Sequence, residues 1–424
     1  MPRKRRSSAT APLAFTVAPG ITPNSARPLG RKTVKLGKLT SRGPMCLRLG
    51  ATLFVEISVS ALKEHRSKCT AEIEGFLPTK AAVFWTDRNG YISARVRPLG
   101  RLLSKAKPRY VKQADFILLN FFNTWDRTVH RIGDCELVLE PHRHINDVTK
   151  RLGIEGGYAI THAGRVCRID GNSMSLRSAR HLLDAIGWYL TFARGAHVHP
   201  MFIEAPSTTT SAVFRDWTTH RSTGWQATDT WFDPFWSLNL FDEAFPGFLA
   251  AYEKHGKPLL IAIDWYLHAH AAEVMDAKII FAVSAIEILA VLAAVGSFEP
   301  AAVAAFDKAY RSAAAKIGAL LTRMHGSAEV PSPLCRLRRS CAAAGIDAPT
   351  IVTRLRNVVH ANQIPHVLKH THAVRSEAAE LAFFWFEAAL LHICGVPISR
   401  ITGRNPPTMG RWSRWTRSRL SSRG

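Results

Sequence analysis

Residues 279–295 read IIFAVSAIEILAVLAAV, an apolar run in which Glu287 is the only charged residue. A carboxylate at the middle of a membrane span is costly in lipid, so we expect a core helix and no membrane span. A buried carboxylate needs a cationic or hydrogen-bonding partner. The run therefore predicts a helical domain in which an arginine, Arg354 or Arg356, meets Glu287 from another helix.

The helical period extends on both sides of this run, and Gly or Pro marks most of the joints. Several helices over some 135 residues fit one compact bundle. We expect the bundle over residues 258–396, with helices at 258–270, 272–295, 300–324, 332–344, 348–362 and 372–394.

The N-terminal half has a different pattern, made of short β-branched and aromatic runs over residues 45–170. Asn89-Gly90 between two such runs is a strong signal for a hairpin, and Ala163-Gly164 is a weaker one. The sequence therefore predicts an α+β protein, in which a β-rich N-terminal domain is followed by an all-helical bundle.

Residues 171–257 link these two parts. A helical pattern begins at Ser175 and ends near Gly195, and residues 201–250 are irregular and rich in Phe and Trp. Such aromatics could form a base-stacking platform, but at this density they more often pack a connector between domains, which is the reading we favour.

Excess positive charge gathers at the two ends of the chain. The 424 residues carry 56 Lys and Arg against 32 Asp and Glu, and no acid precedes Glu56 or follows Glu387. We expect a basic disordered arm over residues 1–44 and a basic tail over residues 397–424. Nucleic acid is the favoured partner of such arms, an anionic membrane surface is the second, and a solvated segment with no partner is the third reading.

The tail adds aromatic side chains to its charge, which could stack on bases. Its predicted nucleic-acid-binding residues are Arg411, Trp412, Arg414, Trp415 and Arg417.

No metal site or cofactor is expected from the sequence. The pairs His142-x-His144, His197-x-His199 and His268-x-His270 lack a carboxylate or cysteine that would complete a ligand set. Gly-rich phosphate loops and the common zinc-protease and serine-hydrolase motifs are absent. Seven widely spaced cysteines without C-x-x-C, and no secretory signal, favour the reducing cytoplasm.

The candidate catalytic residues lie in the stretch 353–362, TRLRNVVHAN. On a helix Arg356 and His360 lie about 40° apart on one face with Asn357 beside them, whereas Arg354 and His360 lie about 240° apart. An arginine and a histidine so placed can bind a phosphate and move a proton beside it. The alternative is an exposed polar helix face.

These residues resemble the HEPN (higher eukaryotes and prokaryotes nucleotide-binding) family, whose signature is Arg-x(4 to 6)-His near the end of a late helix. Arg356 to His360 gives Arg-x3-His, and Arg354 to His360 gives Arg-x5-His with Leu355 where Asn usually follows, so both arginines stay candidates. A wider similarity to bacterial proteins with a β-rich N-terminal half and a HEPN-like (ApeA-like) C-terminal half rests on the stretches at 157–162, 192–195, 224–227 and 246–249.

The resemblance implies metal-independent RNA cleavage by the 2′-hydroxyl, with two motifs meeting across a homodimer. His360 would be the general base or acid, Arg356 or Arg354 would stabilise phosphate charge, Asn357 would position the phosphate, and Glu287 would support them. It also implies a toxin or phage-defence ribonuclease, with a restraining protein partner left open. The alternative is a non-catalytic nucleic-acid-binding or protein-interaction module with a degenerate site.

Overall fold

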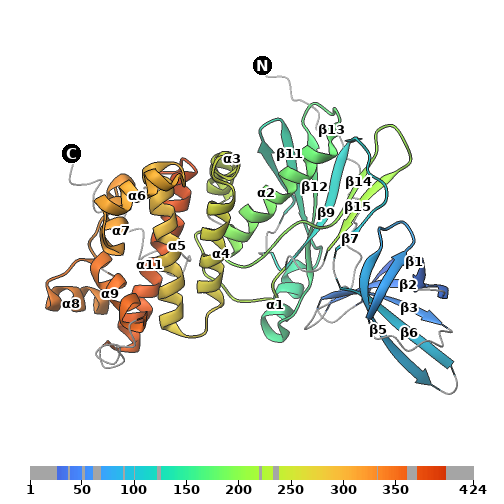
Figure 1. The fold of residues 1–424 in the computed structure, drawn as a ribbon, viewed down its shortest axis with the longest axis horizontal. Helices are drawn as coiled ribbons and strands as arrows, with labels where there is room; N and C mark the ends of the chain where they lie inside the picture. Colours follow the sequence, from blue (N-terminus) through green and yellow to red (C-terminus); the bar gives the residue numbers. More distant parts are fainter. Residues whose placement is uncertain are drawn as a thin grey trace. The chain divides into compact units, whose positions relative to one another are not determined.

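A computed structural model of the chain describes residues 26–36, 39–49, 53–60, 68–88, 91–99, 101–121, 126–218, 222–232, 238–331, 333–360 and 370–397. The strands lie in the N-terminal half and the C-terminal half is helical (Figure 1), which confirms the α+β class. The chain divides into two compact units. The strand-rich unit comprises residues 1–187 and 198–226, and the helical unit comprises residues 188–197 and 227–424.

The strand-rich unit begins with a closed antiparallel barrel, in which the strands follow the order β1-β2-β3-β6-β5-β4. Alternate side chains such as Val34, Met45, Ile57 and Val96 are buried, as expected for strands that turn one face toward a core. The barrel strands are β1 (Ala26–Leu36), β2 (Leu39–Arg48), β3 (Phe54–Ser60), β4 (Lys68–Ile73), β5 (Thr79–Arg88) and β6 (Tyr91–Pro98).

The basic arm predicted over residues 1–44 is wrong in its second half, because β1 and most of β2 lie there. Val34 and Leu36 are buried, whereas Lys35 between them is exposed. The period-2 alternation that marks a strand is present, but the lysines and arginines on its outer face masked it. The turn predicted at Asn89-Gly90 lies outside the described residues, and on either side of it β5 and β6 pair antiparallel, with Arg88 opposite Tyr91.

A second, antiparallel sheet of seven strands has the order β10-β11-β12-β9-β14-β15-β7. Its apolar face shares a core with the barrel, where the rings of Phe76 and Trp217 lie 5.1 Å apart. Its strands are β7 (Leu102–Leu103), β9 (Gln113–Leu119), β10 (Thr128–Ile132), β11 (Cys135–Pro141), β12 (Ile160–Arg168), β14 (Met201–Pro206) and β15 (Val213–Trp217). The remaining elements are the pair β8 (Tyr110–Val111) and β13 (Met174–Ser175), helix α1 (Ile145–Glu155) and helix α2 (Leu176–Arg194), of which residues 188–194 belong to the helical unit.

The hairpin predicted at Ala163-Gly164 is wrong, because β12 runs unbroken through both residues. Gly164 pairs with Phe116 of β9, and a Cβ on Gly164 would lie 2.2 Å from the Phe116 ring. The glycine therefore makes room for an aromatic ring on the neighbouring strand and does not form a turn.

The connector predicted over residues 171–257 is also more regular than expected. Its central part supplies β14 and β15, and its end supplies helix α3 (Leu238–His255). Phe214 and Trp217 are buried in the sheet, Phe241 and Phe248 are buried in α3, and Trp231 is buried in the irregular segment before α3. The interpretation as core aromatics is confirmed for these five, and four of them belong to regular elements.

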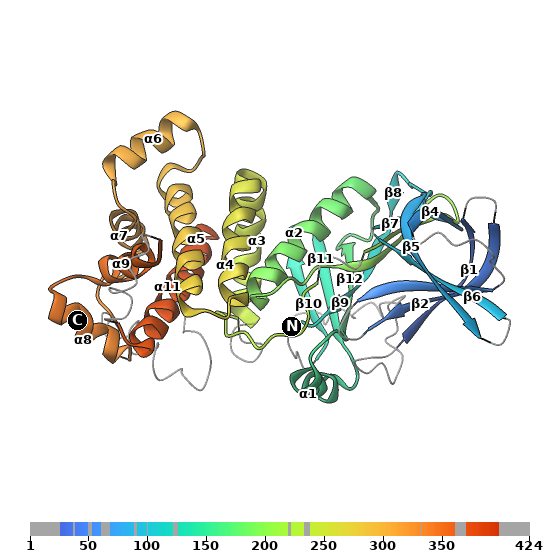
Figure 2. The same cartoon turned by 60° about the horizontal axis from the view of Figure 1, so that its bottom comes forward.

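The helical unit is built around α5 (Met275–Val295), which packs against α4, α7, α9 and α11. In Figures 1 and 2, α5 lies between α4 and the pair α7 and α9. The other helices are α4 (Lys257–Ala271), α6 (Pro300–Ala309), α7 (Ala313–Arg323), α8 (Cys335–Ala344), α9 (Ala348–His360) and α11 (His372–Ile393). The single helix predicted over residues 300–324 is two helices, because the Ser312 side chain accepts a hydrogen bond from Ala315 N and starts α7.

Helix α5 is long and apolar enough to cross a membrane, and within the described part of the chain no other helix meets that measure. Half of its most apolar window is buried inside the protein. Length and composition alone do not separate a span from a core helix, so the core-helix prediction rests on what α5 contacts.

Burial of His162 in β12 makes the stability of the strand-rich unit depend on pH. Desolvation, with a smaller effect of His142, lowers the pKa of His162 from 6.5 to about 3. The unfolded chain therefore binds more protons than the folded one between these values, and the free energy of unfolding falls as the pH drops below 6.5.

Between pH 7 and pH 5, we expect the free energy of unfolding to fall by about 2 kcal/mol more for the wild type than for His162→Gln. The reason is that one full unit of pKa shift corresponds to about 1.4 kcal/mol. Urea unfolding at pH 7, 6 and 5 measures the difference, with exposed His181→Gln as the control. Parallel pH profiles for wild type and His162→Gln would contradict the assignment.

Candidate functional site on α5 and α9

Helix α9 starts at a capped end and buries one face. The backbone N–H of Thr350 donates to Asp347 Oδ1 at 2.9 Å, which satisfies an amide of the first turn. Ile351, Val352 and Leu355 are buried at helical spacing. This face fixes the rotation of α9 and sets Arg356 at its edge, where its side chain is mostly buried.

The structure brings Arg356 and Glu287 together in an ion pair, with Arg356 Nη2 2.9 Å from Glu287 Oε2. Both side chains are about four-fifths buried, with relative exposures of 22% and 21%. The expectation that an arginine of α9 meets Glu287, the lone carboxylate of the apolar run 279–295, is confirmed, and the partner is Arg356. Arg356 Nε has no hydrogen-bond partner among the described residues, so the ion pair does not use all of the guanidinium donors.

The other predicted site residues differ in position. Arg354 and Asn357 are exposed on α9. The backbone of α9 is helical through His360, whose side chain lies outside the described residues. Because the helix is continuous, Arg356 and His360 are one turn apart on one face, and Arg354 lies on another.

A second arginine ties α11 to the same central helix. Arg375 Nη1 donates to both oxygens of Asp276, near the start of α5, at 2.9 and 3.1 Å. Burial, and then the charge of Arg375, lowers the pKa of neighbouring His370. Both α9 and α11 are thus held to α5 by an arginine and a carboxylate.

A buried polar contact that the sequence analysis missed lies between α4 and α11. Tyr266 Oη donates to Glu387 Oε1 at 2.6 Å, and both side chains are fully buried. The sequence contains a signal for a buried carboxylate here, because Glu387 is the only charged residue in the apolar run from Leu381 to Leu391, as Glu287 is in residues 279–295. The pair holds a carboxylate in the core of the unit.

The predicted tail residues Arg411, Trp412, Arg414, Trp415 and Arg417 lie outside the described residues. Within the described ranges, no group of three or more His, Cys, Asp or Glu side chains is arranged to hold a metal ion.

Ion pairs also cross the sheet of the strand-rich unit. Arg165 Nε donates to Asp115 Oδ1 at 2.6 Å with both side chains almost fully buried, and Arg215 Nε donates to Glu204 at 2.9 Å. Asp115 is the cross-strand partner of both Arg165 and Glu204. These four side chains form one row over adjacent strands and specify their register, a structural role.

Comparison with known proteins gives matches in both parts of the chain. A model of the YopA central domain matches residues 107–228, and a model of the YopA C-terminal domain matches residues 253–396. Two stretches of this chain resemble YopA. A curated relative, the SPbeta prophage-derived uncharacterized protein YopA of Bacillus subtilis (strain 168), is 24% identical over 276 residues. The match covers 61% of this chain and 61% of that protein, and no solved structure matches.

The YopA C-terminal match contains both halves of the ion pair, Glu287 and Arg356. The barrel strands β1–β6 lie before the YopA central match.

We expect Glu287→Gln and Arg356→Gln each to lower the free energy of unfolding by about 1–3 kcal/mol, because each leaves a mostly buried charge without its partner. The double variant should lose less than the sum of the two. Urea unfolding measures all three. Exposed Arg354→Gln is the matched control and should change stability by less than about 0.5 kcal/mol. Two results would count against the ion pair: a loss in the double variant equal to the sum of the single losses, or equal losses of stability for Arg356→Gln and Arg354→Gln.

Proposed function

We propose that the helical unit is a metal-independent endoribonuclease of the HEPN type, with Arg356 and His360 as its catalytic residues. The observation that carries the proposal is the ion pair that holds Arg356 against Glu287, one helical turn before His360. Of the two candidate arginines, Arg356 is the one that shares a helix face with His360.

The ion pair suits a phosphate-binding arginine. Glu287 restrains the guanidinium through Nη2, so less side-chain freedom is lost when a phosphate binds. An arginine keeps its positive charge at physiological pH and can donate to the oxygens of a phosphate with its remaining N–H groups. Glu287 is therefore a positioning residue in this proposal.

The proposed reaction is a transesterification within the RNA strand. His360 takes the proton of a 2′-hydroxyl, the 2′-oxygen forms a bond to phosphorus, and the bond from phosphorus to the 5′-oxygen breaks. An acid, His360 of a second copy or water, gives a proton to the leaving 5′-oxygen. Arg356 stabilises the charge that builds on the phosphate, and exposed Asn357 positions the strand.

A second candidate function is a non-catalytic RNA-binding or protein-interaction module. The Arg-x3-His spacing, one residue shorter than the family signature, favours this alternative. An arginine already paired with a carboxylate also suits a purely structural role.

The biological setting belongs to the same proposal. A relative that is prophage-derived agrees with a cytoplasmic ribonuclease acting in a conflict between phage and host, such as a toxin or defence response. The proposed active form is a homodimer in which the two motifs face each other, which a mass measurement in solution at micromolar concentration tests.

We expect the wild-type protein to cleave bulk RNA in EDTA and to leave 2′,3′-cyclic phosphate ends. His360→Ala should reduce the rate by at least about 100-fold, because general acid–base catalysis contributes about 10²–10⁴-fold. Arg356→Ala should also reduce it by about 10²–10³-fold, the usual effect of removing one group that stabilises transition-state charge. Arg354→Ala is the matched control and should keep the rate within a few fold. End-group analysis of the products and initial rates give the measurement.

Two outcomes would contradict the proposal. Equal rates for wild type and His360→Ala would assign any cleavage to another site or to a contaminant. No cleavage by either protein, with RNA binding that weakens with salt in both, would support the binding module.

A further inference from the structure

Three segments of the strand-rich unit come together at one surface. The pair β8 and β13 joins Tyr110 to Ser175, and Leu176 N, at the start of α2, donates to Arg109 O at 3.1 Å. The loop 207–212 between β14 and β15 joins them, since Val111 bridges to Ser207. Backbone contacts therefore fix segments 105–112, 174–181 and 207–212 beside one another.

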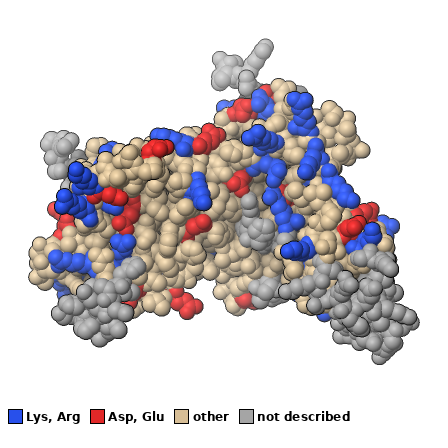
Figure 3. Space-filling view, viewed as in Figure 1, with Lys and Arg blue, Asp and Glu red and all other residues tan. Residues whose placement is uncertain are grey.

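This surface carries six exposed cations. Segment 105–112 contains no acid, and neither does segment 174–181. The cations make no ion pair with any residue that the structure describes, and we call them the basic surface: Lys105, Lys107, Arg109, Lys112, Arg177 and Arg180. Figure 3 shows Lys and Arg side chains over the region that Figure 1 labels α2, β13 and β7.

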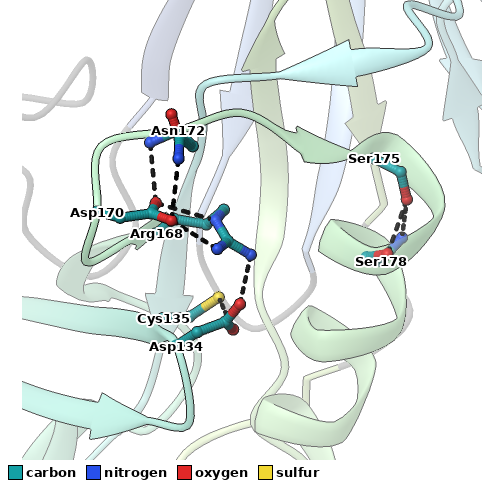
Figure 4. Close-up of polar contacts among 7 residues, drawn as sticks. All are labelled: Asp134, Cys135, Arg168, Asp170, Asn172, Ser175 and Ser178. Atoms are coloured by element: carbon teal, nitrogen blue, oxygen red, sulfur yellow. Dashed lines mark hydrogen bonds and ion pairs between the residues drawn. The ribbon is translucent and has the colours of Figure 1, made fainter.

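Three acids of the strand-rich unit are paired with other arginines. Figure 4 shows Arg168 holding Asp170 through two hydrogen bonds, of 2.6 and 3.0 Å, and reaching Asp134 with its other nitrogen. The hydrogen bonds from Arg168 hold the pKa of Asp170 below its usual range. Asp216, at the end of β15, is paired with Arg101. The positive charge of the basic surface is therefore not neutralised by these acids.

The same surface offers groups that suit a nucleic-acid strand. Tyr110 is 42% exposed, with the Arg109 guanidinium 5.3 Å from its ring. The loop 207–212 exposes the hydroxyls of Thr208, Thr209 and Thr210. Hydroxyls and arginines contact phosphates, and an exposed aromatic ring can stack on an unpaired base.

We propose that the basic surface binds the phosphodiester backbone of single-stranded RNA. The choice of RNA rests on the proposed function, whereas the surface itself rests on charge and chemistry alone. In this proposal the strand-rich unit holds the RNA strand. The residues of the basic surface are different from those of the α9 motif and of the terminal arms. The start of α2 adds to the attraction, since its first turn has no acid and its dipole is positive there.

The test measures RNA binding by the full chain in the His360→Ala background, so that cleavage plays no part. One variant changes Lys105, Lys107, Arg109 and Arg177 to Gln. The matched control removes the same charge from exposed residues of the helical unit, with Lys254, Lys257, Lys308 and Arg311 changed to Gln. Affinity for an unstructured oligoribonucleotide is followed against salt concentration, and circular dichroism checks that both variants are folded.

We expect the basic-surface variant to bind more weakly and to lose about 3 from the slope of log affinity against log salt, because each phosphate contact on a single strand contributes about 0.7. The control should keep the slope of its parent. Equal slopes for the two variants would overturn the proposal, even if the wild type cleaves RNA. Loss of binding to anionic lipid vesicles with unchanged RNA binding would also overturn it, in favour of a membrane surface.

Discussion

The helical unit depends on how one carboxylate is accommodated in an apolar helix. Glu287 stands in the middle of α5, the helix against which most of the unit packs, and an uncompensated charge there would be costly. Arg356 from α9 compensates it at 2.9 Å, and Arg375 from α11 pairs with Asp276 of the same helix. The two contacts fix the positions of the helices before and after the segment 361–369. Because apolar residues of similar volume often stabilise a core at least as well as an ion pair, this pair is weak evidence for a role in stability alone.

In the strand-rich unit, the charged residues that stabilise the fold are different from those that we propose bind RNA. Its ion pair between Asp115 and Arg165 is almost fully buried and specifies strand register, whereas the cations of the basic surface are exposed and make no ion pair among the described residues. Buried pairs cost desolvation and are tolerated for specificity, but exposed, unopposed charges cost little in a monomer and are available to a polyanion. The two roles can therefore be changed independently by substitution.

The sequence predicts this fold well where a single pattern dominates. Glu287 in its apolar run predicted a core helix and an arginine partner, and the 3.6-residue period located most helices of the bundle. It failed where two signals overlap. Basic side chains on the outer face, such as Lys35 between Val34 and Leu36, hid a barrel strand, and Gly164 suggested a turn although it makes room for Phe116. The basic surface could not be predicted from one segment, because it is assembled from three segments joined by the pairing of β8 with β13 and by the bridge from Val111 to Ser207. The same holds for Glu387, whose partner Tyr266 is 121 residues away.

The most direct test of this account is to map where RNA lies on the chain. An oligoribonucleotide with 2′-O-methyl groups cannot be cleaved through its 2′-oxygens, and photoreactive bases in it can be cross-linked to the wild-type protein and located by mass spectrometry. The account predicts cross-links in residues 105–112 and 354–360. Cross-links confined to residues 1–25 and 398–424 would contradict it, because RNA would then be held by the basic ends alone.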